Sequence, residues 1–152
     1  MMSMVRINSN DPGLITRALD CGANGIMVPH VNTAEEARQI ATASRYGPIG
    51  NRGQFGGRRS FGVRDHHRLA NENVMTAILI EDIVAIRNLP AILEVDGIDV
   101  FYVAPSDLEG LHEVEHDAHG HLRIAEVNLG EILKAQVQSR LRQLGVKTTI
   151  AA

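Results

Sequence analysis

Short runs of apolar and β-branched residues alternate along the chain with stretches whose apolar residues recur at helical spacing. The runs that predict strands are Met4–Ile7, Gly25–Val31, Val74–Ile80, Val100–Ala104 and the start of another at Val146–Ala151. Strands that alternate with helices are typical of βαβ units, in which a helix joins two parallel strands. The pattern therefore predicts an α/β fold built on a parallel sheet.

The stretches between these strands carry signals for helix ends. We predict a first helix that begins at Asn10-Asp11-Pro12 and ends at Gly22, and a second that is capped by Thr33 and Glu36 and runs through Ala43. A short polar helix is expected near Asp65–Asn73, followed by a helix over Ile83–Val95 with a break near Pro90. The segment Leu122–Leu144 is expected to be mostly helical. No exact repeat, low-complexity tract or linker interrupts this order, so we expect one domain over residues 1–152.

Composition and charge narrow the class of protein. The chain has 152 residues, 3% aromatic residues and no Trp, so the core must be built from Ile, Leu, Val and Ala. A formal net charge of -3 argues against a nucleic-acid binder, and no apolar run approaches the length of a membrane helix. Cys21 is the single cysteine, which excludes an intramolecular disulfide and fits a cytoplasmic protein. We expect Cys21 to be a small buried residue rather than a nucleophile.

Side chains suited to ligand binding or catalysis follow several of the predicted strands. Arg6 and His30 are separated by close to one βα repeat, and so are Glu81 and Asp107. Because carboxylates at one level on neighbouring strands suit a hard divalent cation, Glu81 and Asp107 indicate a site for Mg²⁺ or Mn²⁺. The alternative is that an acidic residue after a strand caps the next helix, which is the role we expect of Asp82.

The Gly-rich stretch from Tyr46 to Gly62 has two interpretations. It lacks the Gly-Lys-Ser/Thr ending of a P-loop, so a mobile loop over an active site is preferred to a nucleotide site. Its arginines, Arg52, Arg58 and Arg59, either contact an acidic substrate tail or are solvated.

Histidines raise two further possibilities. One cluster combines imidazoles with carboxylates: His112, Glu113, Glu115, His116, Asp117, His119 and His121. A transition-metal site is conceivable there, but no regular element is evident and an exposed polar loop is preferred. His30 can reach a ligand from its strand end, although a structural or solvent-facing role is preferred.

Several of these residues fall in motifs of one known family. The motifs are Val5-Arg6, Asn10-Asp11-Pro12, Leu19-Asp20 with Gly22-Ala23, Val28-Pro29, Arg45-Tyr46-Gly47-Pro48 with Gly50-Asn51-Arg52-Gly53, Ile80-Glu81, and Ala104-Pro105-Ser106-Asp107-Leu108. In this order and spacing they resemble the HpcH/HpaI aldolase family, within the wider group related to the citrate lyase β subunit. The likeness covers about Val5 to Leu108 and weakens beyond it.

The resemblance implies a lyase with a (β/α)8 barrel. Such class II aldolases cleave a 4-hydroxy-2-oxo acid to pyruvate and an aldehyde through a metal-bound enolate, and the implied ligands of Mg²⁺ or Mn²⁺ are Glu81 and Asp107. Lys134 and Lys147 are the only lysines, and neither lies at a strand end early in the sheet, which argues against a Schiff-base mechanism. The aldehyde stays open. CoA-ester lyases of the wider group also stay open, although the Gly-Asn-Arg-Gly loop favours an aldolase.

The resemblance also implies roles for other residues. Arg6 corresponds to an arginine that contacts the keto oxygen of pyruvate and stabilises the enolate. Pro105, Ser106 and Asp107 correspond to the loop that receives the pyruvate carboxylate. Asp20 corresponds to an aspartate that supports a base histidine across a subunit boundary, which implies a homo-oligomer.

The resemblance implies that the chain begins on the third strand of the barrel, without the base histidine expected on the second, and ends in the seventh. We therefore expect a partial (β/α)8 TIM barrel of about five parallel strands with helices, whose first two and last strands are absent. Its open sheet edges call for a partner, unless the chain is a fragment. The alternative function is a catalytically impaired fragment or a non-enzymatic subunit that binds metal or an oxo acid.

Overall fold

The computed structural model describes residues 2–54 and 60–104, and in the remainder residues 114–116, 118–119, 122–124 and 127–128. The chain divides into two compact units, Met1–Ala104 and Pro105–Ala152. The expectation of one domain over residues 1–152 stays a prediction.

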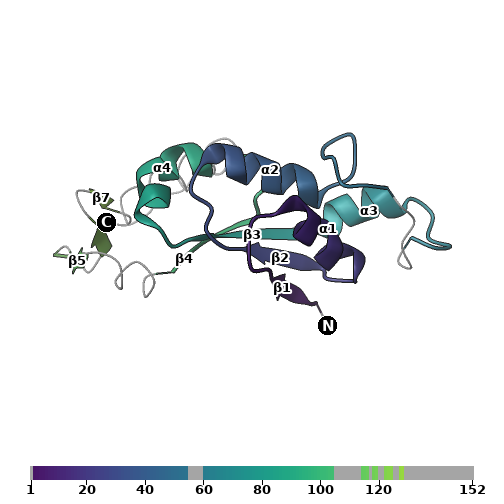
Figure 1. Ribbon diagram of the computed structural model, residues 1–152, viewed down its shortest axis with the longest axis horizontal. Helices are drawn as coiled ribbons and strands as arrows, with labels where there is room; N and C mark the ends of the chain where they lie inside the picture. The colour runs from purple at the N-terminus through teal and green to yellow at the C-terminus, as the bar shows by residue number, and fades with distance from the viewer. Residues whose placement is uncertain are drawn as a thin grey trace, which may run out of the picture. The chain divides into compact units, whose positions relative to one another are not determined.

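The first unit is built on a four-stranded parallel sheet. Its strands are β1 (Met4–Arg6), β2 (Gly25–Val28), β3 (Met75–Ile80) and β4 (Val100–Val103), and they lie in the order β1-β2-β3-β4 (Figure 1). The register pairs Arg6 with Met27 and Val28 with Ile78, so the carboxyl ends of the strands meet at one edge of the sheet. The predicted α/β fold with a parallel sheet is confirmed, whereas the partial barrel stays a prediction.

Four helices connect and cover these strands. They are α1 (Pro12–Asp20), α2 (Ala34–Ser44), α3 (His66–Asn73) and α4 (Ile83–Leu93), and α1, α2 and α4 lie along one face of the sheet (Figure 1). Asp11 caps α1 by accepting from the N–H groups of Gly13 and Leu14, and Thr33 forms a complete capping box with Glu36 at the start of α2. Both predicted helix starts are therefore confirmed.

The core lies between the sheet and these helices. Strand β3 is buried from Thr76 to Ile80, and the largest fully buried side chains are almost all aliphatic: Ile15, Leu19, Ile26, Val28, Ile40, Ile78, Ile80, Ile86, Leu89 and Ile92. Burial of each such side chain stabilises the fold by about 1.5–3 kcal/mol. The aliphatic core predicted from the low aromatic content is confirmed.

Two expectations for this unit are wrong. Helix α4 passes through Pro90 without ending there, because Ile86, Leu89 and Ile92 are fully buried along it and their packing offsets the hydrogen bond that Pro90 does not make. Cys21 is exposed rather than buried. It caps the C-terminus of α1, where Gly22 at φ +116° turns the chain toward β2.

The second unit contains a small antiparallel sheet, β5-β6-β7. Its strands are β5 (Val114–His116), β6 (Leu122–Ile124) and β7 (Val127–Asn128). The helix expected to begin at Leu122 is wrong for Leu122–Ile124, and the expectation of no regular element around His116 is wrong as well. Apolar and polar residues alternate in β6, Leu-Arg-Ile, which is the strand period of two. The rest of the helix expected up to Leu144 and the strand expected over Val146–Ala151 lie outside the described residues.

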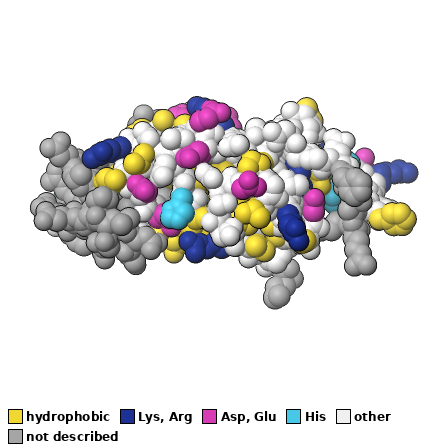
Figure 2. All heavy atoms as spheres, viewed as in Figure 1, with side chains coloured by type: hydrophobic (Ala, Val, Ile, Leu, Met, Phe, Trp, Pro, Cys, Tyr) yellow, Lys and Arg dark blue, Asp and Glu magenta, His cyan; other side chains and the backbone are white. Residues whose placement is uncertain are grey.

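The surface of the described part carries charges of both signs. Acidic and basic side chains are interspersed over the face shown in Figure 2 rather than gathered into one large patch of either sign. No helix among the described residues combines the length and the apolar character that a membrane crossing requires.

Candidate functional site

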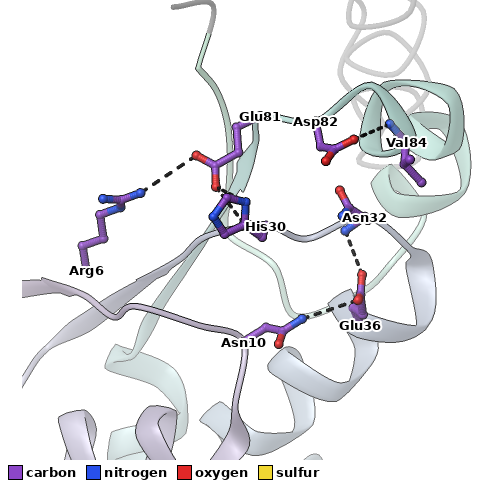
Figure 3. A network of polar contacts seen from close by, with 8 residues as sticks. All are labelled: Arg6, Asn10, His30, Asn32, Glu36, Glu81, Asp82 and Val84. Carbon is purple, nitrogen blue, oxygen red and sulfur yellow. Dashed lines mark hydrogen bonds and ion pairs between the residues drawn. The ribbon is translucent and has the colours of Figure 1, made fainter. Parts of the chain in front are cut away.

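The candidate site lies at the carboxyl edge of the parallel sheet. Arg6 is the last residue of β1, His30 follows β2 by two positions, and Glu81 follows β3 directly. Because the three strands are adjacent and parallel, these side chains from distant parts of the sequence meet (Figure 3). Of the residues predicted for the site, the structure brings Arg6 and Glu81 together.

Glu81 is the buried centre of the site. Its side chain is only 5% exposed, and its Oε1 accepts a hydrogen bond of 2.8 Å from the backbone N–H of His30. The ring Nδ1 of His30 lies 3.1 Å from the same oxygen, and Nη2 of Arg6 lies 4.0 Å from Oε2. A buried carboxylate needs such partners because it has lost its water. The backbone N–H of His30 therefore holds Oε1 closely, whereas Arg6 lies at the longer distance of 4.0 Å from Oε2.

Arg6 is placed to meet a ligand. Its side chain is 61% exposed, and its guanidinium points toward the Glu81 carboxylate in Figure 3. An exposed guanidinium beside a buried carboxylate can donate to an anionic or carbonyl oxygen that enters the site.

His30 is the residue of the site for which the sequence analysis preferred a structural or solvent-facing role over ligand contact. Its side chain is 68% exposed, which agrees with the preferred solvent-facing role, yet its ring and its backbone both contact Glu81. Its backbone is left-handed, with φ at 54°. The one sequence signal for this contact is its position at a strand end after Pro29.

Behind His30, a polar network holds the turn between β2 and α2. Glu36 accepts at Oε2 from the backbone N–H groups of Asn32 (2.8 Å) and Thr33 (2.9 Å), and at Oε1 from the Asn10 side chain (3.5 Å). The side chain of Asn88 donates to the backbone oxygen of Asn32 at 2.8 Å. These contacts fix the backbone two residues beyond His30. Oδ1 of Asn32 is buried and has no hydrogen-bond partner among the described residues.

The neighbouring acidic residue has a structural role. Asp82 caps α4, because its Oδ1 accepts from the backbone N–H of Val84 at 2.9 Å. The predicted helix-capping role of Asp82 is therefore confirmed. Pro105, Ser106 and Asp107 lie outside the described residues, and within the described part no three His, Cys, Asp or Glu side chains gather in a group suited to hold a metal ion.

Asp20 lies away from this site. It ends α1, which returns the chain to the start of β2, so Asp20 is at the opposite edge of the sheet from Glu81. Its Oδ1 accepts from Nη2 of Arg52 at 2.5 Å. Arg52 is buried and stacks over the ring of Tyr46 at 4.5 Å.

The prediction that Arg52 is solvated is wrong, because its side chain is buried. The alternative, contact with an acidic substrate tail, stays a prediction, and within this chain Arg52 lies beside Asp20 rather than beside Glu81. It lines a pocket of about 230 Å³ with Asn24, His66 and Val74 at the amino edge of the sheet. Arg58 and Arg59 lie outside the described residues.

Protein families and relatives give an independent comparison. The family model described as HpcH/HpaI aldolase/citrate lyase matches residues 1–141. The chain is 39% identical over 128 residues to the 2-keto-3-deoxy-L-rhamnonate aldolase of Klebsiella pneumoniae subsp. pneumoniae, a match that covers 82% of this chain and 48% of that protein. It is 44% identical over 114 residues to the 4-hydroxy-2-oxovalerate aldolase of Novosphingobium aromaticivorans, which covers 72% and 44%. The chain spans about half the length of the curated relatives it matches.

Solved structures agree with this comparison. An HpcH/HpaI aldolase from Desulfitobacterium hafniense superposes with a TM-score of 0.68 at 26% identity, and the match covers 100% of this chain and 59% of that one. An HpcH/HpaI aldolase/citrate lyase family protein from Burkholderia cenocepacia gives a TM-score of 0.66 at 28% identity, with 94% and 56% covered.

Proposed function

Because the chain belongs to the HpcH/HpaI aldolase/citrate lyase family, we propose that it carries part of a metal-dependent aldolase site that cleaves a 4-hydroxy-2-oxo acid to pyruvate and an aldehyde. The observation that carries the proposal is the buried Glu81 carboxylate beside Arg6 at the carboxyl edge of a parallel sheet. Two relatives support the substrate class, since each is named as an aldolase and each name denotes a 2-oxo acid.

Glu81 fits a ligand of a hard divalent cation. Carboxylate oxygens are the donors that Mg²⁺ and Mn²⁺ prefer. Within the described part of the chain, the contact of Glu81 Oε2 is the one of 4.0 Å with Arg6, while Oε1 is already held by His30. The family resemblance gives Asp107 as the second ligand. When bound, such a cation supplies a Lewis acid next to the keto oxygen.

Arg6 is the residue of this chain proposed to stabilise the negative charge that develops during the reaction. In a retro-aldol cleavage the bond between C3 and C4 breaks, its electron pair moves toward the keto oxygen, and the proton of the C4 hydroxyl passes to a base. The exposed guanidinium of Arg6 is proposed to donate to the keto oxygen as negative charge develops there. The backbone of Pro105–Asp107 is proposed to receive the substrate carboxylate.

Asp20 is proposed to act on a second subunit. Within this chain it lies at the opposite edge of the sheet from Glu81, so it has no access to the Glu81 site of its own subunit. A role in orienting a base histidine of a neighbouring subunit is compatible with that position. Such a role of Asp20 across a subunit boundary would make the active form a homo-oligomer.

The metal ligands are tested by thermal unfolding with and without Mn²⁺ or Mg²⁺. Glu81→Ala and Asp107→Ala are expected to abolish the metal-induced rise in melting temperature. Asp82→Ala is the matched control, because it removes a neighbouring carboxylate that only caps a helix. It should lower the metal-free melting temperature by about 2–4 °C, corresponding to a cap worth about 1 kcal/mol, and keep the metal-induced rise. Equal metal-induced shifts in melting temperature in all three variants would contradict the assignment of Glu81 and Asp107 as metal ligands.

A further inference from the structure

The backbone of His30 adopts a conformation that L-residues avoid. Its φ of 54° lies in the left-handed region, where a Cβ crowds the neighbouring carbonyl. Such outliers persist when the surrounding structure holds them, and they concentrate at functional sites. The backbone near His30 is held by hydrogen bonds, because Glu36 and Asn88 both bond the backbone of Asn32, two residues after His30.

The unusual conformation brings two donors of one residue to one oxygen. The backbone N–H of His30 donates to Oε1 of Glu81 at 2.8 Å, and ring Nδ1 lies 3.1 Å from the same Oε1 (Figure 3). The second contact is a hydrogen bond only if Nδ1 carries the proton. Together, the two contacts restrain the carboxylate against rotation and leave Oε2 facing Arg6.

We propose that His30 is a positioning residue, which accepts backbone strain in order to lock the Glu81 carboxylate in the orientation that presents Oε2 to a divalent cation. This inference rests on the proposed function of the same site. Partners that orient a ligating carboxylate typically change metal affinity by tenfold or more when they are removed. Strand β1 brings the charged guanidinium of Arg6 to this carboxylate, and Nη2 of Arg6 contacts Oε2 at 4.0 Å.

Three substitutions at His30 separate positioning from structure. His30→Gly keeps the backbone N–H and removes both the ring donor and the left-handed strain. His30→Asn keeps tolerance of the left-handed region and an N–H donor on a shorter side chain. His30→Ala keeps the strain and removes the donor. All three are measured for melting temperature without metal, and for Mn²⁺ affinity by calorimetry with free Mn²⁺ as the probe.

The proposal predicts opposite effects on stability and on binding. His30→Gly should melt at the wild-type temperature or up to about 3 °C higher, while it binds Mn²⁺ about tenfold more weakly. His30→Asn should bind within about threefold of wild type, and His30→Ala should lose both stability and affinity. A residue with a purely structural role would instead lower the melting temperature of His30→Gly and leave its Mn²⁺ affinity unchanged.

The outcomes also separate this inference from the proposed function. If the wild-type chain binds Mn²⁺ and His30→Gly binds it equally well, the positioning role is overturned and the metal site stands. If the folded wild-type chain binds no Mn²⁺, the proposed function is overturned and the positioning role falls with it.

Discussion

Arg52, in the Gly-rich stretch, places its buried guanidinium against the carboxylate of Asp20 at the end of α1, with Nη2 and Oδ1 2.5 Å apart. The face of the same guanidinium lies over the ring of Tyr46, 4.5 Å from its centroid. An ion pair and a cation–π contact therefore tie the Gly-rich stretch to the first helix at the amino edge of the sheet. They also fix the side chain of Asp20, the residue proposed to act across a subunit boundary.

Removal of this buried arginine should destabilise the fold. Arg52→Met leaves Asp20 without its partner and removes the contact with Tyr46, so the free energy of unfolding should fall by about 2–3 kcal/mol. Urea denaturation measures the change. Arg68→Met is the matched control, because Arg68 pairs with Glu72 on the exposed face of α3 and such pairs contribute at most about 1 kcal/mol. Losses of equal size in the two variants would show that burial gives the Arg52 pair no special role.

Gly50 is predicted to be irreplaceable for steric reasons. A Cβ at this position would meet the backbone oxygens of Arg45 and Thr42 well inside van der Waals contact. The same two oxygens accept hydrogen bonds from the backbone N–H groups of Arg52 and Asn51, both at 2.9 Å, so the turn cannot open without losing them. Gly50→Ala should therefore lower the free energy of unfolding by about 2 kcal/mol or more.

Gly53 provides the control for that experiment. Among the described residues, no atom outside the two chain neighbours lies within 4 Å of a Cβ built at Gly53, so Gly53→Ala should leave the free energy of unfolding within about 0.5 kcal/mol or raise it slightly. Denaturant midpoints measured for both variants test the contrast. A Gly50→Ala variant as stable as Gly53→Ala would mean that the turn is not as tight as described.

Local sequence patterns predicted the elements of the first unit well. Asp11 and Thr33 cap their helices as expected, because capping depends on residues two or three positions apart. The helix through Pro90 could not be predicted in this way. Its continuity depends on the burial of residues such as Ile86 and Leu89 against other elements, which no local pattern contains.

The candidate site was predictable in part. Its position followed from the rule that carboxyl ends of parallel strands share an edge, which places Arg6 and Glu81 together. The role of His30 depends on a left-handed φ and on a partner 51 positions away, so the sequence pattern did not reveal it. The burial of Arg52 depends in the same way on Asp20, 32 positions earlier, so the Gly-rich context alone left open a solvated arginine, which is wrong.

Hydrogen exchange of pyruvate tests whether Glu81 belongs to a metal-dependent site for pyruvate chemistry, and it requires no choice of aldehyde. The methyl protons of pyruvate are followed by NMR in D₂O with Mg²⁺ or Mn²⁺ added, with chelator and with Glu81→Ala and Asp82→Ala as controls. If Glu81 has this role, exchange should require metal, disappear in Glu81→Ala and persist in Asp82→Ala. A folded, metal-bound chain that catalyses no exchange would contradict this role, and would favour a non-enzymatic subunit that binds metal or an oxo acid.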